Sequence, residues 1–129
     1  MMHSFLRCAV LICVTVGLSA QAPKQSGQVA GGCENAVTTA TMRTCEGLRY
    51  TTANRELDEA YQALMDRLDA GQKQKLRIAQ RAWLRFRDAN ADFESSQAQG
   101  GTLAPLLRLG TLTEMTIART NELKKDAAP

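Results

Sequence analysis

Apolar side chains recur at steps of three and four residues from Thr38 onwards, and no stretch there alternates as a β-strand would. This spacing predicts an all-helical domain. The clearest stripe, with successive spacings of 3, 4, 3, 4 and 3, consists of Leu76, Ala79, Trp83, Phe86, Asn90 and Phe93. We expect this stripe to face the core, which places Asn90 among apolar neighbours.

The first helix is expected to begin at Thr38, whose hydroxyl can cap the first turn, and to end near residues 68–71. Gly47 and the pair Thr51 and Thr52 each weaken a helix by about half to one kcal/mol relative to alanine. A straight helix, a kink and a break near these residues all remain open. The apolar stripe of this helix comprises Tyr50, Ala53, Leu57, Ala60 and Leu64.

Two further helices follow. Asp69 and Gln72 resemble a capping box, which predicts a second helix over residues 70–96, before a glycine pair. The third helix is expected over residues 102–125, with its first residue, a threonine, as the cap and Pro105 in the first turn, where the missing amide costs nothing. Three helices with short connections predict a small antiparallel bundle. The buried side of the third helix should comprise Leu106, Leu109, Leu112, Met115, Ile117 and Leu123.

The first 20 residues have the three parts of a secretory signal peptide: Arg7 in a short positive region, an apolar run, and small residues up to Ala20. The apolar run is too short to cross a bilayer, which takes about 20 helical residues. Residues 21–32 are rich in Gly, Gln and Ser and are expected to form a flexible leader. The sequence therefore predicts a helical domain over residues 33–129 that is periplasmic or secreted.

The composition of residues 21–129, which follow the expected cleavage site, limits the kinds of function that this part of the chain can have. Cleavage after Ala20 would remove His3, the single histidine, and two of the four cysteines. It would also remove Arg7 and no acidic residue, so the 16 basic residues would fall to 15 against 13 acidic ones, a net charge of +2. Without histidine, the usual groups for acid–base catalysis and metal binding are scarce. A nearly neutral surface with few aromatic residues does not favour nucleic acid. We therefore expect a non-catalytic binding protein with no cofactor and a protein partner.

Cys33 and Cys45 are the cysteines left after cleavage, and we expect them to pair in an oxidising compartment. Seven helical residues from Thr38 to Cys45 rise about 10 Å, and the five extended residues that precede them reach about 17 Å. A loop of this length is worth about 3 kcal/mol on the chain-entropy estimate. The functional alternative is a free nucleophilic thiol or a metal-binding pair.

Charged residues form two groups. The second helix carries a basic row in steps of four, and the first helix carries a group of acidic residues. The acidic group comprises Glu56, Asp58, Glu59, Asp66 and Asp69. Each group is either a solvated face or a surface for a charged partner, and the two groups are also able to pair with each other inside the bundle. The candidate partner-binding residues are Arg81, Arg85, Glu56 and Glu59.

Three polar residues fall on sides that are expected to be buried: Arg87, Asn90 and Arg119. A buried arginine needs acceptors, and we expect each guanidinium to meet a carboxylate, such as that of Glu56, or a carbonyl at a helix end. The hypothesis is a structural role for these three residues in place of direct ligand contact.

Several short motifs occur in a fixed order along the chain. They are Cys33-x-x-Ala36-x-Thr38-x-x-x-Met42-x-x-Cys45, then Glu56-Leu57-x-x-x-Tyr61, then Gln80-Arg81-Ala82-Trp83-x-x-Phe86-Arg87-Asp88-Ala89, then Gly100-Gly101-Thr102-Leu103-x-Pro105, then Arg119-Thr120-x-Glu122-Leu123. The pattern resembles the lysozyme inhibitor LprI-like N-terminal domain family, and the resemblance covers nearly all of the chain after the leader. It implies an exported bacterial helical domain. Members typically carry two further cysteines, at positions held here by Ala91 and Thr111, so it also implies one disulfide where many relatives have two.

The sequence thus predicts an exported binding protein, and the family resemblance implies that it inhibits a peptidoglycan-cleaving lysozyme. The alternative is a non-catalytic envelope or secreted interaction module with a different protein partner. The sequence leaves the oligomeric state open.

Protein recovered from the periplasm or the medium of an expressing bacterium is expected to begin at Gln21, because the signal peptide is cut after Ala20. It is also expected to contain no free thiol, since Cys33 and Cys45 are expected to form a disulfide. N-terminal sequencing and thiol titration check the two points. An N-terminus at Met1 or two titratable thiols would contradict them.

Overall fold

The computed structural model describes residues 33–128, and the expected signal peptide and leader, residues 1–32, lie outside this range. A short 3-10 helix, η1 (Cys33–Asn35), precedes three long helices, α1 (Thr39–Arg67), α2 (Ala70–Ser96) and α3 (Ala104–Asp126). Residues 33–128 contain no β-strand. The prediction of an all-helical bundle with three main helices is confirmed.

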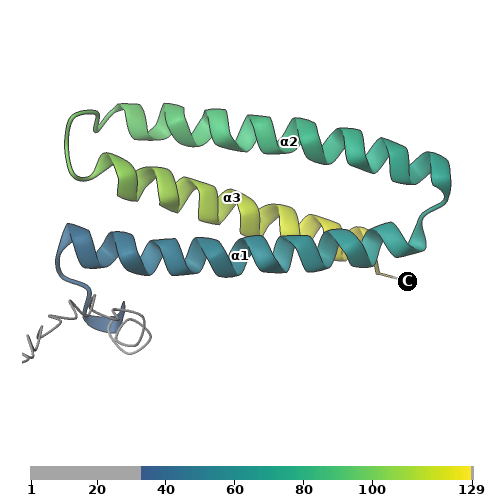
Figure 1. Ribbon diagram of the computed structural model, residues 1–129, viewed down its shortest axis with the longest axis horizontal. Coiled ribbons are helices and arrows are strands. Elements are labelled where there is room, and N and C mark those ends of the chain that lie inside the picture. The colour runs from purple at the N-terminus through teal and green to yellow at the C-terminus, as the bar shows by residue number, and fades with distance from the viewer. Residues whose placement is uncertain (1–32, 129) are drawn as a thin grey trace, which may run out of the picture.

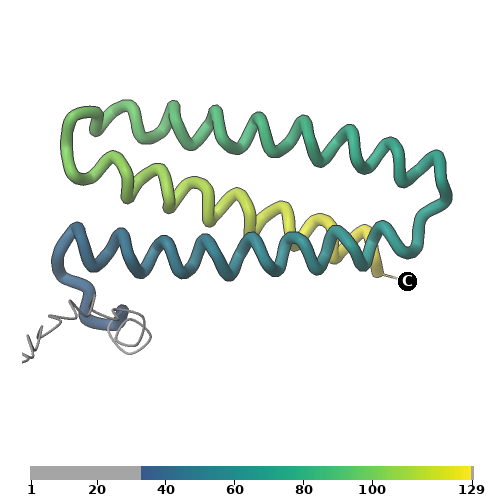
Figure 2. The backbone as a smooth tube through the Cα atoms, viewed as in Figure 1, coloured from purple at the N-terminus to yellow at the C-terminus, as the bar shows by residue number. Residues whose placement is uncertain are grey.

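Successive helices run antiparallel, and short connections join them at the two ends of the bundle (Figure 1). Helix α3 packs against both α1 and α2, and its packing against α1 is the more extensive. Its carboxyl-terminal half lies beside α1, as the backbone tube in Figure 2 shows. Helix α2 therefore depends on α3 for most of its contact with the rest of the domain.

Helix α1 is one uninterrupted helix of 29 residues, so no break forms at Gly47 or at the two threonines that follow it. The Thr51 hydroxyl donates to the carbonyl of Gly47 at 2.9 Å, which satisfies the side chain within the helix. Burial of the apolar stripe outweighs the weak propensity of this segment, because tertiary packing supplies most helix stability in proteins. Thr38 caps the helix as expected: its Oγ1 accepts from the Thr41 amide at 3.1 Å.

The capping box of α2 is also confirmed, since Asp69 Oδ1 accepts from the Gln72 amide at 2.8 Å. The predicted cap of α3 is wrong. Leu103, and not Thr102, holds the N-cap position, and no side chain caps this end. The turn before it contains Gly100 at a φ of 84°, a conformation that glycine adopts without strain.

The hydrophobic core lies where α1 meets the carboxyl-terminal half of α3. Its buried centre comprises Leu57, Ala60, Leu64 and Leu123, and partly buried apolar side chains, among them Trp83 of α2, pack against it. The predicted inward stripe of α1 is largely correct, because Ala53, Leu57, Ala60 and Leu64 are all buried.

The predicted inward stripe of α2 is wrong for much of its length. Phe86 is 60% exposed and Phe93 is 64% exposed. The buried residues of α2 are instead Gln80, Arg87 and Ala91. Helix α2 is rotated so that two polar side chains point inward, and both find hydrogen-bond partners there.

Helix α3 differs from its prediction in a similar way. Leu112 and Leu123 are buried as expected, but so are the three threonines Thr113, Thr116 and Thr120. Thr113 and Thr120 donate their hydroxyls to the carbonyls four residues earlier, at 2.8 and 2.9 Å. Because the helix itself satisfies these hydroxyls, α3 can be buried on two sides with small side chains that let both neighbours approach.

The Leu123→Ala substitution is expected to lower the free energy of unfolding by about 2 to 5 kcal/mol, because it empties a fully buried position. Leu107→Ala is the matched control, since Leu107 is on the same helix and is 39% exposed. The control should cost less than about 1 kcal/mol. Urea denaturation followed by circular dichroism measures both, and equal losses would contradict this description of the core.

Candidate partner-binding surfaces

Cys33 and Cys45 form the expected disulfide, with their Cα atoms 5.6 Å apart. The bond ties η1 to the second turn of α1. The prediction of one disulfide between these two residues is confirmed. The alternatives of a free thiol and of a metal-binding pair are thereby excluded for this state of the chain.

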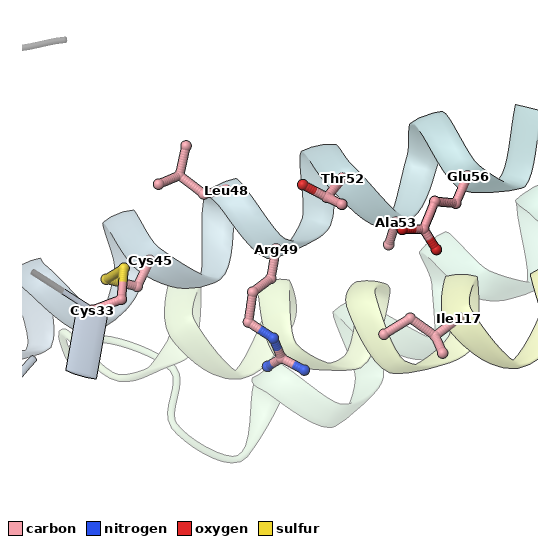
Figure 3. Close-up of a pocket in the computed structure, with 8 residues that line it drawn as sticks. All are labelled: Cys33, Cys45, Leu48, Arg49, Thr52, Ala53, Glu56 and Ile117. Atoms are coloured by element: carbon pink, nitrogen blue, oxygen red, sulfur yellow. A yellow bond between two sulfur atoms is a disulfide. The ribbon is translucent and has the colours of Figure 1, made fainter. Parts of the chain in front are cut away.

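A hollow of about 380 Å³ lies beside this bond and is lined by residues of η1, α1 and α3; we call it the disulfide hollow. Figure 3 shows Leu48, Arg49 and Glu56 of α1 along it, with Ile117 of α3 on the opposite wall. The lining is mostly apolar. Glu56, a candidate from the sequence, is therefore part of this hollow.

Arg49 closes one side of the disulfide hollow with two ion pairs. Its Nη1 lies 2.8 Å from Glu46 Oε2, and its Nη2 lies 3.0 Å from Glu114 Oε1 of α3. The hydrogen bond to Glu46, followed by that to Glu114, raises the pKa of Arg49. The guanidinium is thus already neutralised, which leaves Glu56 as the unpaired charge of the hollow. No sequence motif indicated this role for Arg49.

A second depression, of about 320 Å³, lies between α1 and α2; we call it the α1–α2 groove. Asp58, Tyr61 and Gln62 line it from α1, and Arg77 and Arg81 line it from α2. Neither Arg77 nor Arg81 has an ion-pair partner among residues 33–128. The groove therefore presents two guanidinium groups without ion-pair partners, together with the Asp58 carboxylate and hydrogen-bonding side chains.

The four candidate residues do not form one surface. Arg81 lines the α1–α2 groove, whereas Glu56 lines the disulfide hollow. Glu59 pairs with Arg55 on α1 at 3.1 Å, with both side chains more than 60% exposed. Arg85 is exposed and lies outside both depressions. Within residues 33–128 no ion pair joins α1 to α2, so the basic and acidic groups do not neutralise each other there.

The side chain of Arg87 is buried, with 6% of the residue exposed, and it joins all three helices. Nη1 donates to Asn54 Oδ1 of α1 and to Thr116 Oγ1 of α3, both at 3.3 Å. Nε and Nη2 donate to Asp88 Oδ1 at 3.0 and 2.8 Å. The guanidinium also lies 5.3 Å from the ring centre of Trp83, within range of a cation–π interaction.

Arg119 and Asn90 are also held by contacts within the bundle. Arg119 donates to Gln80 Oε1 at 3.2 Å and to Glu122 Oε2 at 2.9 Å. The Asn90 amide lies 3.4 Å from the sulfur of Met115. The suggested acceptor Glu56 takes part in none of these contacts.

No group of three or more His, Cys, Asp or Glu side chains within residues 33–128 is arranged to hold a metal ion. None of the helices described there is long and apolar enough to span a membrane. The described residues thus form a small all-helical domain with one disulfide at its start, and the disulfide hollow and the α1–α2 groove are the depressions that contain candidate residues.

Comparison with known proteins identifies the family. A family model described as lysozyme inhibitor LprI matches residues 32–123. An uncharacterized protein of Rhizobium meliloti (strain 1021) is 31% identical over 130 residues, which cover 91% of this chain and 89% of that protein. No solved structure matches. The chain belongs to the lysozyme inhibitor LprI family.

Replacement of Arg87 by alanine is expected to lower the free energy of unfolding by about 3 kcal/mol, because it removes a buried ion that holds partners on three helices. Arg85→Ala is the control, since Arg85 is exposed two residues away and should cost less than about 0.5 kcal/mol. Urea unfolding curves measure both variants. If the free energy of unfolding of the Arg87→Ala protein is close to that of the unmodified protein, the buried contacts of Arg87 do not hold the bundle together.

Proposed function

We propose that this protein is exported and acts as a binding protein that inhibits a peptidoglycan-cleaving lysozyme. The observation that carries the proposal is membership of a family described by that activity, with the match extending over nearly all of the structured region. Export follows from the signal peptide expected in the first 20 residues. We further propose that the domain itself is not catalytic.

The α1–α2 groove is the surface we assign to the enzyme. Lysozymes cleave the glycosidic bond with a pair of carboxyl groups in their substrate cleft. Arg77 and Arg81 are the two groove residues with guanidinium groups left unpaired. Guanidinium groups form bidentate, charge-assisted hydrogen bonds with carboxylates, so an arginine entering the cleft would compete with substrate for the catalytic pair.

Long-range attraction contributes little to this binding. The familiar lysozymes are cationic, and the exported domain is expected to carry a small positive charge as well. Electrostatic steering raises association rates only where the two surfaces carry opposite potentials. The affinity must therefore come from short-range contacts at the groove, and it should depend on those arginines individually.

The test uses protein recovered from the periplasm, incubated with animal-type, goose-type and invertebrate-type lysozymes while the turbidity of a cell-wall suspension is followed. At about 1 μM domain we expect slower clearing with at least one enzyme. Reversal of both groove charges, Arg77→Glu with Arg81→Glu, should weaken inhibition at least about tenfold, since two charge-assisted contacts become repulsive.

The matched control reverses Lys124 and Lys125, which lie in the last turn of α3 and change the net charge by the same amount. This variant should inhibit within about threefold of the unmodified protein. Equal losses in the two variants would move the contact away from the groove. No slowing with any of the three enzymes would remove the lysozyme proposal and leave an interaction module with a different protein partner.

A further inference from the structure

The outer face of α2 carries an apolar row that nothing in residues 33–128 covers. Phe86 is 60% exposed and Phe93 is 64% exposed, and the two alanines that alternate with them are exposed as well. Successive spacings of four, three and four keep the members on one side of a helix. The row is Ala82, Phe86, Ala89 and Phe93.

A row of charged residues runs beside the apolar row. Each member of the charged row directly precedes one member of the apolar row in the sequence. The members of the charged row, in order along the chain, are Arg81, Arg85, Asp88 and Asp92. The two arginines have no ion-pair partner among residues 33–128. The two carboxylates each bind a neighbouring arginine of the same chain through Oδ1 alone, and their side chains are 51% and 64% exposed. All four side chains are therefore open to a further partner.

Each row is complementary to the same row on a second copy of the chain whose α2 runs in the opposite direction. The apolar row reads small, large, small, large, so its reverse sets each phenylalanine against an alanine. The charged row reads positive, positive, negative, negative, so its reverse sets each arginine against an aspartate. In a parallel copy the apolar row would place phenylalanine on phenylalanine, and the two charged rows would lie on opposite sides of the helix pair, where they cannot meet.

We propose that the outer face of α2 binds a second copy of this chain in an antiparallel dimer, with the twofold axis passing at the level of residues 86–88. Phe86 then packs on Ala89 of the second copy and Phe93 packs on Ala82. Arg81 meets Asp92 and Arg85 meets Asp88. In a dimer of this symmetry each contact occurs twice, so four short apolar contacts and four ion pairs form along one pair of helices.

Other occupants suit this face less well. An anionic lipid surface would attract the arginines but repel the two aspartates that share their row. Any surface with charges of one sign would be repelled by one half of the charged row, either the arginines or the aspartates. A partner that carries the same charges in reverse order pairs with both the arginines and the aspartates of the charged row. The small side chains of Ala82 and Ala89 also let a second helix approach closely, because interaxial distance is set by the residues at the contact.

The interface is small. Residues 82–93 rise only about 17 Å along the helix. A contact of that length lies at the low end of specific interfaces, so the expected dissociation constant is on the order of 10 to 100 μM. The domain would then be mostly a single chain at the concentration of the lysozyme assay, which separates this proposal from the function proposed above.

The first experiment is sedimentation equilibrium of the periplasmic protein from about 5 to 500 μM. We expect the mass to rise from one chain towards two. Phe86→Glu should keep a single-chain mass throughout, whereas the control Leu48→Glu, at an exposed apolar residue of α1, should behave like the unmodified protein. Circular dichroism verifies that both variants are folded. A single-chain mass for the unmodified protein at every concentration would overturn the proposal.

The second experiment tests the antiparallel order. Arg81→Asp and Asp92→Arg each place like charges together in their own dimer and should shift the dissociation constant at least about tenfold upward. An equimolar mixture of the two restores both ion pairs and should regain the mass of the unmodified dimer. A mixture that stays single-chain would overturn the assigned order. If the unmodified chain stays single and binds phosphatidylglycerol vesicles through Phe86, a lipid surface is the occupant and the dimer is wrong.

Discussion

A guanidinium buried among three helices is the constraint on which the rest of this bundle depends. Arg87 sits in α2, but two of its acceptors belong to α1 and α3. A buried ion is tolerated only when its donors are satisfied, so the three helices must keep the rotation that presents those acceptors. This requirement turns the side of α2 that carries Arg87 and Gln80 inward and turns Phe86 and Phe93 outward.

The outward rotation of α2 also explains the distribution of its charges. The inward arginine is paired, whereas Arg81 and Arg85 face solvent without partners in the described domain. Because α1 meets α2 through few contacts, a groove with unpaired guanidinium groups remains between them. The same geometry leaves an apolar row on the far side of α2. One helix therefore carries both the surface proposed for the enzyme and the surface proposed for a second copy, with Arg81 at the edge of each.

Local chemistry was the part of the structure that the sequence predicted well. The helix starts at Thr38 and Asp69 depend on side-chain bonds to amides three residues on, and such signals do not involve the rest of the fold. The disulfide was predictable because few cysteines were left to choose from. The inward face of α2 was not, because two neighbouring stripes both have helical spacing and the choice between them depends on acceptors from distant helices. For the same reason, the separation of Glu56 from Arg81 could not be seen before the helices were assembled.

The bond between Cys33 and Cys45 affects the stability of the precursor if the protein is exported as proposed. The cytoplasm is reducing and prevents this disulfide from forming, so the newly made precursor lacks a bond that is worth about 3 kcal/mol of stability. For a protein exported as proposed, that deficit favours a loosely folded precursor, which a translocation channel can thread. Oxidation after the proposed export would then add the bond that ties η1 to the second turn of α1, and the domain would gain its full stability only outside the cytoplasm.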